Sequence, residues 1–113
     1  MTSRTILGAT LLAATIAFAA AAQAQGEVKG DPSRAKEKIS MCSGCHGIPD
    51  YRTAYPSVYY VPMIAGQSPG YIVKALEAYK SGERTHPSMR AIARSLSERD
   101  MADLAVYYST AAK

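Results

Sequence analysis

The sequence contains no tryptophan, one phenylalanine and only two cysteines in 113 residues. Two cysteines exclude a disulfide-rich scaffold, and the length allows one domain rather than several. The net charge of +4 comes without the clustered lysine and arginine that are typical of a nucleic-acid binder. After the first two dozen residues there is no long hydrophobic run, so no membrane span is expected in the rest of the chain. Eight tyrosines supply nearly all of the aromatic mass.

The beginning of the chain has the three-part order of a secretory signal peptide. Arg4 precedes an uncharged, alanine-rich run from Ile6 to Ala22, and Ala22-Gln23-Ala24 is the small-x-small pattern that signal peptidase accepts. The alternative is a membrane anchor, which requires about 20 strongly apolar residues, and this run is shorter and mostly alanine. We therefore expect a cleaved signal peptide of residues 1–24, a periplasmic mature domain of residues 25–113, and no stable membrane insertion after cleavage.

The mature domain is predicted to be all-α. Asp31 and Pro32 are a typical N-cap and first helical residue, Ser68 and Gly82 bracket a second helix, and Ser97-x-x-Asp100 resembles a capping box. Four helices follow from these signals and from the apolar periodicity: Asp31 to about Met41, Pro69 to Ser81, Met89 to Ser95, and Glu98 to about Ser109.

Two of these helices carry an apolar stripe that predicts the core. In the last helix the stripe is Met101, Leu104, Ala105 and Tyr108, and in the second it is Ile72, Ala75, Leu76 and Tyr79. The segment from Gly44 to Gly66 has no helical period and is predicted to be a long loop. The run Val58 to Val61 favours a strand by composition, but the flanking Pro56 and Pro62 argue against one. A loop of this length in a small domain suggests that it wraps around a non-protein group.

The most informative segment is Cys42-Ser43-Gly44-Cys45-His46. The pattern C-x-x-C-H is the attachment motif of c-type haem. Each thiol forms a bond to one vinyl group of the porphyrin, and the histidine that follows binds the iron. One haem c, attached through Cys42 and Cys45 with His46 as proximal ligand, is therefore the expected cofactor.

Three other interpretations of the motif are weaker. A thioredoxin-like pair needs a βαβ context, which the sequence lacks. A structural zinc site needs four ligands, and adjacent Cys45 and His46 can hardly both reach one tetrahedral ion. A disulfide between Cys42 and Cys45 would close a very short loop and leave His46 unexplained.

The second axial ligand has several candidates. Met89 lies in the segment Thr85 to Met89, which is predicted to be an irregular connection between two helices and is favoured for that reason. His86 in the same segment and an open position stay as alternatives. Met101 is predicted to fill the core, Met63 to form a wall, and Met41 to belong to the attachment side.

These residues, with several further motifs, resemble the single-domain monohaem class I cytochromes c, and one half of the dihaem periplasmic cytochromes c of proteobacteria. The resemblance runs from Gly30 to about Tyr108. Beside the attachment motif, it is carried by Gly30-Asp31-Pro32, Pro62-x-Ile64-Ala65-Gly66-Gln67, Tyr79-Lys80-x-Gly82-x-Arg84, His86-Pro87-x-Met89 and Leu96-Ser97-x-x-Asp100-Met101-x-x-Leu104-Ala105-x-Tyr107-Tyr108. The tyrosine-rich stretch Tyr51 to Tyr60 does not map onto the family pattern.

The resemblance implies a class I cytochrome c fold, with about four helices and long loops around one covalently attached haem. It implies that His46 and Met89 bind the iron, and that the Pro62 carbonyl accepts a hydrogen bond from His46. It also implies that Ile64, Gly66, Gln67 and Arg84 lie at the haem, that Arg84 faces a propionate, and that the first and last helices pack together.

The expected function is that of a periplasmic electron carrier and not of an enzyme. The alternative is an electron-transfer subunit of a periplasmic dehydrogenase or oxidase complex, and a haem enzyme or gas sensor with an open iron site is a third reading. Donor and acceptor proteins are the expected partners, and the basic charge suits an acidic docking surface. Nucleic acid is not an expected partner, and the sequence leaves the oligomeric state open.

Overall fold

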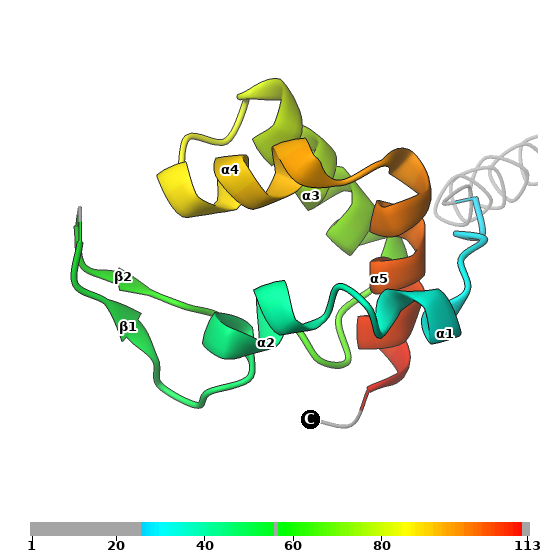
Figure 1. Cartoon of the computed structure of the whole chain (residues 1–113), viewed down its shortest axis with the longest axis horizontal. Coiled ribbons are helices and arrows are strands. Elements are labelled where there is room, and N and C mark those ends of the chain that lie inside the picture. Colours follow the sequence, from blue (N-terminus) through cyan, green and yellow to red (C-terminus); the bar gives the residue numbers. More distant parts are fainter. Residues whose placement is uncertain (1–25, 56, 112–113) are drawn as a thin grey trace, which may run out of the picture.

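A computed structural model describes residues 26–55 and 57–111 of the chain. Its elements follow in the order α1 (Pro32–Ala35), α2 (Ser40–His46), β1 (Arg52–Thr53), β2 (Tyr59–Tyr60), α3 (Pro69–Ser81), α4 (Pro87–Ser95) and α5 (Glu98–Thr110). Figure 1 shows α3 and α4 on one side, α1 and α2 on the other, and α5 joining them at one end. The predicted signal peptide lies outside the described residues, and within them no helix is long and apolar enough to cross a membrane.

The first predicted helix is divided into two. Asp31 caps α1 as expected, because its side chain accepts a hydrogen bond from the Ser33 amide at 2.9 Å, and Pro32 is the first helical residue. Between α1 and α2 the backbone bonds tighten to three-residue spacing, as from the Lys38 amide to the Ala35 carbonyl at 2.8 Å. The helix then resumes and continues to His46, so the whole attachment motif is helical. The sequence had placed the second half of the motif in the loop that begins at Gly44, and that prediction is wrong.

The predicted loop contains a small antiparallel hairpin, so the prediction of a loop without strands is wrong here, whereas the mostly helical fold is confirmed. Arg52 pairs with Tyr60, and Thr53 pairs with Tyr59. Proline disfavours strands because it cannot donate a ladder bond, but none of the paired residues is proline, so this objection does not apply to them. The Thr53 hydroxyl strengthens the hairpin, since it accepts from the Tyr59 amide and donates to the Ser57 carbonyl, both at 3.1 Å.

The middle helices begin and end close to the predicted residues. Helix α3 has the predicted bounds and ends at Gly82, whose φ of 96° is a left-handed conformation that suits glycine. Ser68 stands at the N-cap of α3, but its side chain makes no capping bond, which corrects the predicted cap. Helix α4 begins at Pro87, earlier than predicted, because His86 caps it.

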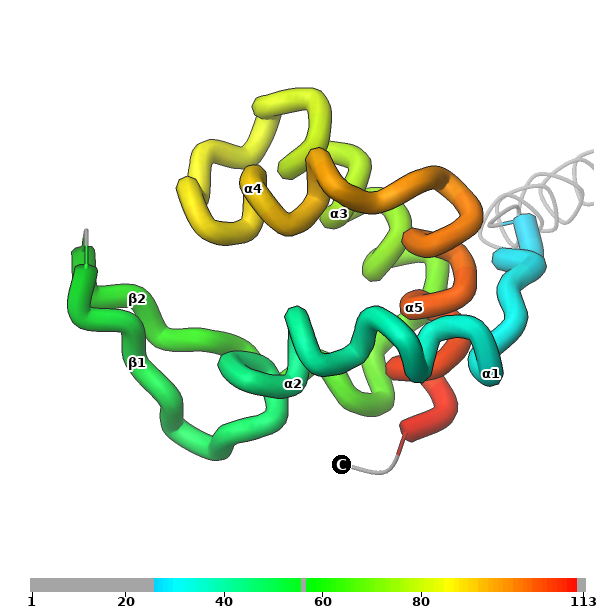
Figure 2. The backbone as a smooth tube through the Cα atoms, viewed as in Figure 1, coloured from blue at the N-terminus to red at the C-terminus, as the bar shows by residue number. Residues whose placement is uncertain are grey.

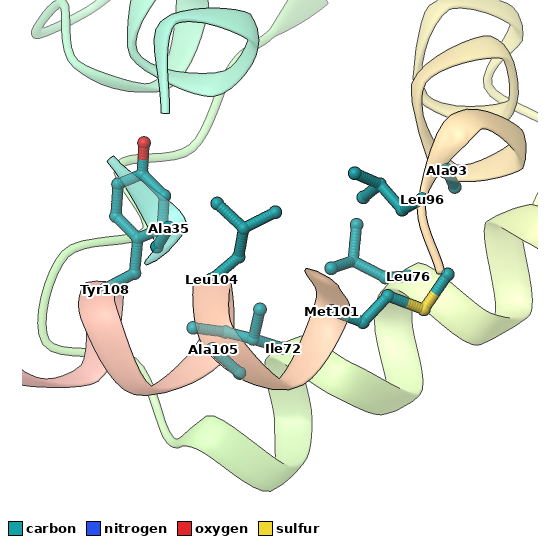
Figure 3. Packing of buried hydrophobic residues seen from close by; sticks show 9 residues of the cluster. All are labelled: Ala35, Ile72, Leu76, Ala93, Leu96, Met101, Leu104, Ala105 and Tyr108. Carbon is teal, nitrogen blue, oxygen red and sulfur yellow. The ribbon is translucent and has the colours of Figure 1, made fainter. Parts of the chain in front are cut away.

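Helix α5 supplies four of the nine buried apolar residues, more than any other element. Ser97 and Asp100 form the predicted capping box at its start. Figure 3 shows the stripe of α5 facing residues of α1, α3 and α4. All four stripe residues are buried, together with one or two residues of each neighbouring element: Ala35, Ile72, Leu76, Ala93, Leu96, Met101, Leu104, Ala105 and Tyr108. Met101 is 1% exposed, which confirms its predicted place in the core.

The two ends of the described chain are joined by polar contacts. The buried Asp103 carboxylate on α5 accepts two hydrogen bonds from Arg34, at 2.8 and 2.9 Å, and one from the Asp31 amide at 2.6 Å. The Tyr108 hydroxyl donates to the Ile39 carbonyl at 3.5 Å. The predicted packing of the first and last helices is therefore present, and it fixes the start of α2 against α5.

Candidate functional site

A cavity of about 670 Å³ lies between α2, the hairpin, α3 and α4. Its wall contains eight of the nine residues predicted to bind the cofactor. These are Cys42, Cys45, His46, Pro62, Ile64, Gln67, Arg84 and Met89. The site therefore gathers residues that are far apart in the sequence, and most of its other wall residues are apolar or aromatic.

Helix α2 presents the attachment motif to this cavity. Residues three and four positions apart are neighbours on a helix surface, so Cys42 lies beside both Cys45 and His46. Both thiols are free, and all three side chains are partly buried on the cavity wall. Partial burial raises the pKa of the Cys42 thiol, because desolvation disfavours the thiolate. The helical form of the motif thus places both thiols on one face.

His46 is held by the chain that follows the hairpin. Its Nδ1 atom lies 2.6 Å from the Pro62 carbonyl oxygen. A carbonyl oxygen only accepts, so Nδ1 must carry the proton and donate. This assigns the tautomer in which Nε2 is the unprotonated nitrogen that can bind a metal. The hydrogen bond that the resemblance implied is present.

Met89 stands on the opposite side of the cavity, in the first turn of α4. It is partly buried and lines the cavity. The sequence placed it in an irregular connection, which is wrong, because α4 starts two residues earlier at Pro87. A helix start offers the same advantage, since the capped first turn fixes the backbone that carries the side chain.

The other candidate ligands are placed differently. His86 also lines the cavity, but its Nδ1 accepts a hydrogen bond from the Met89 amide at 3.4 Å. Met63 lies on the wall and is 47% exposed, and Met41 lies beside Cys42 on the attachment side. Met101 belongs to the core and does not reach the cavity.

Arg84 is held on the cavity wall by two tyrosines. Its guanidinium donates to the Tyr71 hydroxyl at 3.2 Å and lies over the Tyr71 and Tyr79 rings, 5.7 and 5.3 Å from their centroids. The hydrogen bond to Tyr71 raises the pKa of Arg84, so the side chain keeps its positive charge. Arg84 is therefore an ordered cation at the cavity and not a freely solvated one.

The remaining predicted residues divide between the wall and the backbone. Ile64 and Gln67 line the cavity, and the Gln67 side chain also accepts from the Ser68 amide at 2.8 Å. Gly66 is the exception, since it is not on the wall. With a φ of 77°, its amide donates to the Tyr108 carbonyl at 2.8 Å, so its contact is with α5.

The sequence did not assign the hairpin to the site. Thr53, Tyr59 and Tyr60 all line the cavity, and the Tyr59 ring meets the His86 ring edge-on at 4.5 Å. The tyrosine-rich composition was the available signal, but only the three-dimensional structure shows which tyrosines line the cavity. Tyr55, on the same hairpin, is 88% exposed and lies outside the wall.

The residues of the cavity fit a covalently attached haem. Two free thiols, an oriented imidazole and a thioether form the donor set of a haem c site, and the volume and mainly apolar wall suit a large flat macrocycle. A structural zinc site fits less well. Among the described residues, no three histidine, cysteine or acidic side chains are grouped so that they could hold a metal ion.

Comparison with known proteins supports the same cofactor. The chain is 36% identical to cytochrome c-554(548) of Halomonas halodenitrificans, over 72% of this chain and 96% of that protein. It is 33% identical to cytochrome c4 of Pseudomonas aeruginosa, over 72% of this chain but only 38% of that longer protein. It is also 33% identical to the cytochrome subunit of sulfide dehydrogenase of Chlorobaculum tepidum, over 72% and 69% of the two chains. No family model matches the chain.

Proposed function

The chain belongs to the class I cytochrome c family, and we propose that it is a periplasmic carrier of single electrons with His46 and Met89 as its axial ligands. One observation carries the proposal. The two thiols and the imidazole of the attachment motif line the same cavity as Met89, and the Pro62 carbonyl already orients the imidazole.

Each residue has a separate task in this account. Cys42 and Cys45 would hold the cofactor through two thioether bonds, which would prevent its loss. His46 supplies Nε2, and its hydrogen bond to Pro62 keeps the ring in one orientation. When bound, haem supplies an iron that alternates between Fe(III) and Fe(II). Met89 would supply its thioether sulfur as the second ligand, from the first turn of α4.

The thioether side chain of Met89 also explains why we favour an electron carrier over an enzyme. A protein ligand at the sixth position blocks binding of O₂ or peroxide, whereas an open position permits it. Carbon monoxide tests this directly on the purified, reduced protein. An absorption spectrum unchanged by carbon monoxide supports a carrier. Rapid formation of a carbon monoxide adduct would instead support an enzyme or gas sensor with an open site.

Export to the periplasm is part of the same proposal. It is supported by the signal-peptide pattern of residues 1–24 and by the need to attach haem to free thiols after export. Intact-mass analysis of protein from periplasmic extract is expected to show a chain that begins at Gln25 and carries one haem. A chain that keeps residues 1–24 would contradict cleavage.

A second function is favoured by one relative, which is the cytochrome subunit of a sulfide dehydrogenase. In this version the chain transfers electrons inside a complex with a catalytic subunit. Gel filtration of native extract distinguishes the two. Elution of the haem band at the size of the isolated chain supports a free carrier, and stable co-elution with a larger subunit supports a complex.

Recognition of acidic redox partners is the remaining part of the proposal. Several cations are engaged within the protein, since Arg34 pairs with Asp103, Lys38 with Asp100 and Lys74 with Glu77. Exposed cations remain on α4 and at the start of α5, at Arg94 and Arg99. If these steer a partner, electron-transfer rates fall as ionic strength rises. Rates that do not change with salt would contradict steering.

A further inference from the structure

The hairpin formed by β1, β2 and the chain between them reaches from the proximal to the distal side of the cavity. Its base leads through Val61 to Pro62, whose carbonyl holds His46. Its second strand carries Tyr59, whose ring contacts His86 on the other side. Figure 2 shows the hairpin rising toward the beginning of α4, at the end of the molecule opposite α5. This hairpin is also the stretch that departs from the family pattern.

His86 connects this contact to Met89. It is the N-cap of α4, and its Nδ1 atom accepts from the Met89 amide at 3.4 Å. Its ring meets Tyr59 at a centroid distance of 4.5 Å and an interplanar angle of 64°, an edge-on geometry that is favourable for aromatic rings. One imidazole therefore bonds to the backbone of the proposed ligand and packs on the hairpin at the same time.

The hairpin is not stable by its own pairing. Two strands of two residues each are marginal in water without further packing. The bonds of Thr53 to Ser57 and Tyr59 stiffen it locally, and Arg52 lies 4.6 Å from the centroid of the Tyr60 ring. The contact between Tyr59 and His86 is therefore the point at which the stiffened hairpin packs against the start of α4.

We propose that His86 is a positioning residue for Met89, and that Tyr59 holds His86 in this role through the hairpin. The inference rests on the proposed function, because it concerns how Met89 is presented to the iron. The imidazole of His86 caps the turn that carries Met89, and the Tyr59 ring fixes the rotamer in which Nδ1 faces the Met89 amide. Loss of either contact loosens the first turn of α4 and makes the sulfur ligand easier to displace.

Displacement of the sulfur ligand by exogenous imidazole measures this directly in the oxidised holoprotein. Tyr59→Ala and His86→Ala are each expected to raise the apparent imidazole affinity roughly fivefold, the size expected for loss of an N-cap. The two effects should not add in the double variant, because both act through one contact chain. Affinities equal to wild type in both single variants would overturn the proposal.

Matched variants separate positioning from general weakening of the fold. Tyr55→Ala removes a tyrosine from the same hairpin that is 88% exposed and lies off the cavity wall, so it should behave as wild type. Tyr59→Phe keeps the ring that packs on His86, so its imidazole affinity should lie closer to wild type than that of Tyr59→Ala. His86→Asn restores a capping acceptor without the large ring, and it is expected to recover most of the wild-type behaviour. If His86→Asn does not recover the wild-type imidazole affinity and Tyr55→Ala also raises it, then His86 has only a structural role and the proposal is overturned.

The reduction potential provides a second readout. Because thioether ligation raises the potential, Tyr59→Ala and His86→Ala should lower it, whereas Tyr55→Ala should not. This outcome is distinguishable from failure of the proposed function. Absence of covalent haem or of a sulfur-to-iron band in the wild type would contradict the proposed function. An intact band with unchanged imidazole affinity in both variants would contradict only the positioning role.

Discussion

The Nδ1 atom of His46 and the carbonyl oxygen of Pro62 lie 2.6 Å apart, although His46 ends α2 and Pro62 follows β2, sixteen residues further along the chain. This bond orients the imidazole before any cofactor chemistry is considered, because a donor at Nδ1 leaves Nε2 free to bind iron. The backbone of Pro62 is placed by the hairpin that precedes it. The proximal half of the site is therefore built by α2 and the hairpin together.

Substitution of Met89 is expected to remove the sulfur-to-iron band. In Met89→Ala the far-red band of the oxidised protein should disappear, the reduction potential should fall, and the reduced protein should bind carbon monoxide. Met63→Leu is the matched control, since Met63 also lines the cavity. An oxidised spectrum that is unchanged in Met89→Ala but altered in Met63→Leu would assign the ligand to Met63.

Substitution of Arg84 is expected to lower the reduction potential without changing the ligands. Reduction adds an electron to the site, and the ordered Arg84 cation at the wall favours that added charge. Arg84→Gln should lower the potential by on the order of tens of millivolts. Arg94→Gln is the control, because this exposed cation on α4 is not part of the wall. Equal shifts in both variants would show a general charge effect.

Asp103 is expected to matter for stability and not for the spectrum. Asp103→Ala removes the acceptor of the Asp31 amide and of two Arg34 bonds. A buried network that loses its acceptor costs about 1–3 kcal/mol in the free energy of unfolding. Glu77→Ala, which breaks an exposed pair with Lys74, should cost less than about 1 kcal/mol. Denaturant titrations that give equal losses would contradict the structural role of Asp103.

The same carboxylate predicts part of the acid sensitivity. Hydrogen bonds from Arg34 hold the pKa of Asp103 below its ordinary value of 3.8. A carboxyl group whose pKa is lowered in the folded state stabilises the protein at pH values above its ordinary pKa. That stabilisation is lost as the pH falls through the pKa of the folded state. Wild type should therefore lose its stability advantage over Asp103→Asn as the pH drops below about 4. A difference between the two proteins that stays constant from neutral pH to pH 2 would contradict this.

Gly30 is expected to tolerate no side chain. A Cβ atom at this position would lie 2.2 Å from the Ala102 carbonyl oxygen, so the N-terminal segment could not remain against α5. Gly30→Ala should destabilise the protein by about 1–3 kcal/mol. Gly26→Ala is the control, because a Cβ atom at Gly26 would meet no neighbouring atom within 4 Å. Thermal unfolding at equal temperatures for both variants would contradict the close packing.

The sequence was most informative where local rules decide the structure. The bounds of α3, the capping box of Ser97 and the buried stripe of α5 follow from capping and periodicity, and the C-x-x-C-H motif predicts its own chemistry. The division between α1 and α2 and the start of α4 depend on tertiary contacts and on an unusual histidine cap. No local sequence pattern predicts the buried hydrogen-bond network of Asp103, because its partners are about 70 residues away in the chain.

The hairpin shows the limit of sequence reasoning most clearly. Its prolines argued against strands, and its tyrosines could not be divided into cavity and solvent residues without the three-dimensional structure. Tyr59, which pairs with Thr53, is the tyrosine whose ring meets His86. A pairing of two residues per strand is too short for periodicity to detect, and it is stabilised by contacts to elements that lie elsewhere in the sequence.

The most direct test of the account is an absorption spectrum of the matured protein, recorded in both oxidation states during a potentiometric titration and after acid–acetone extraction. We predict a Soret band that survives extraction, a far-red sulfur-to-iron band in the oxidised form, and a single reversible one-electron transition. A Soret band lost on extraction, or an oxidised spectrum without the far-red band, would contradict covalent haem with His46 and Met89 as its ligands.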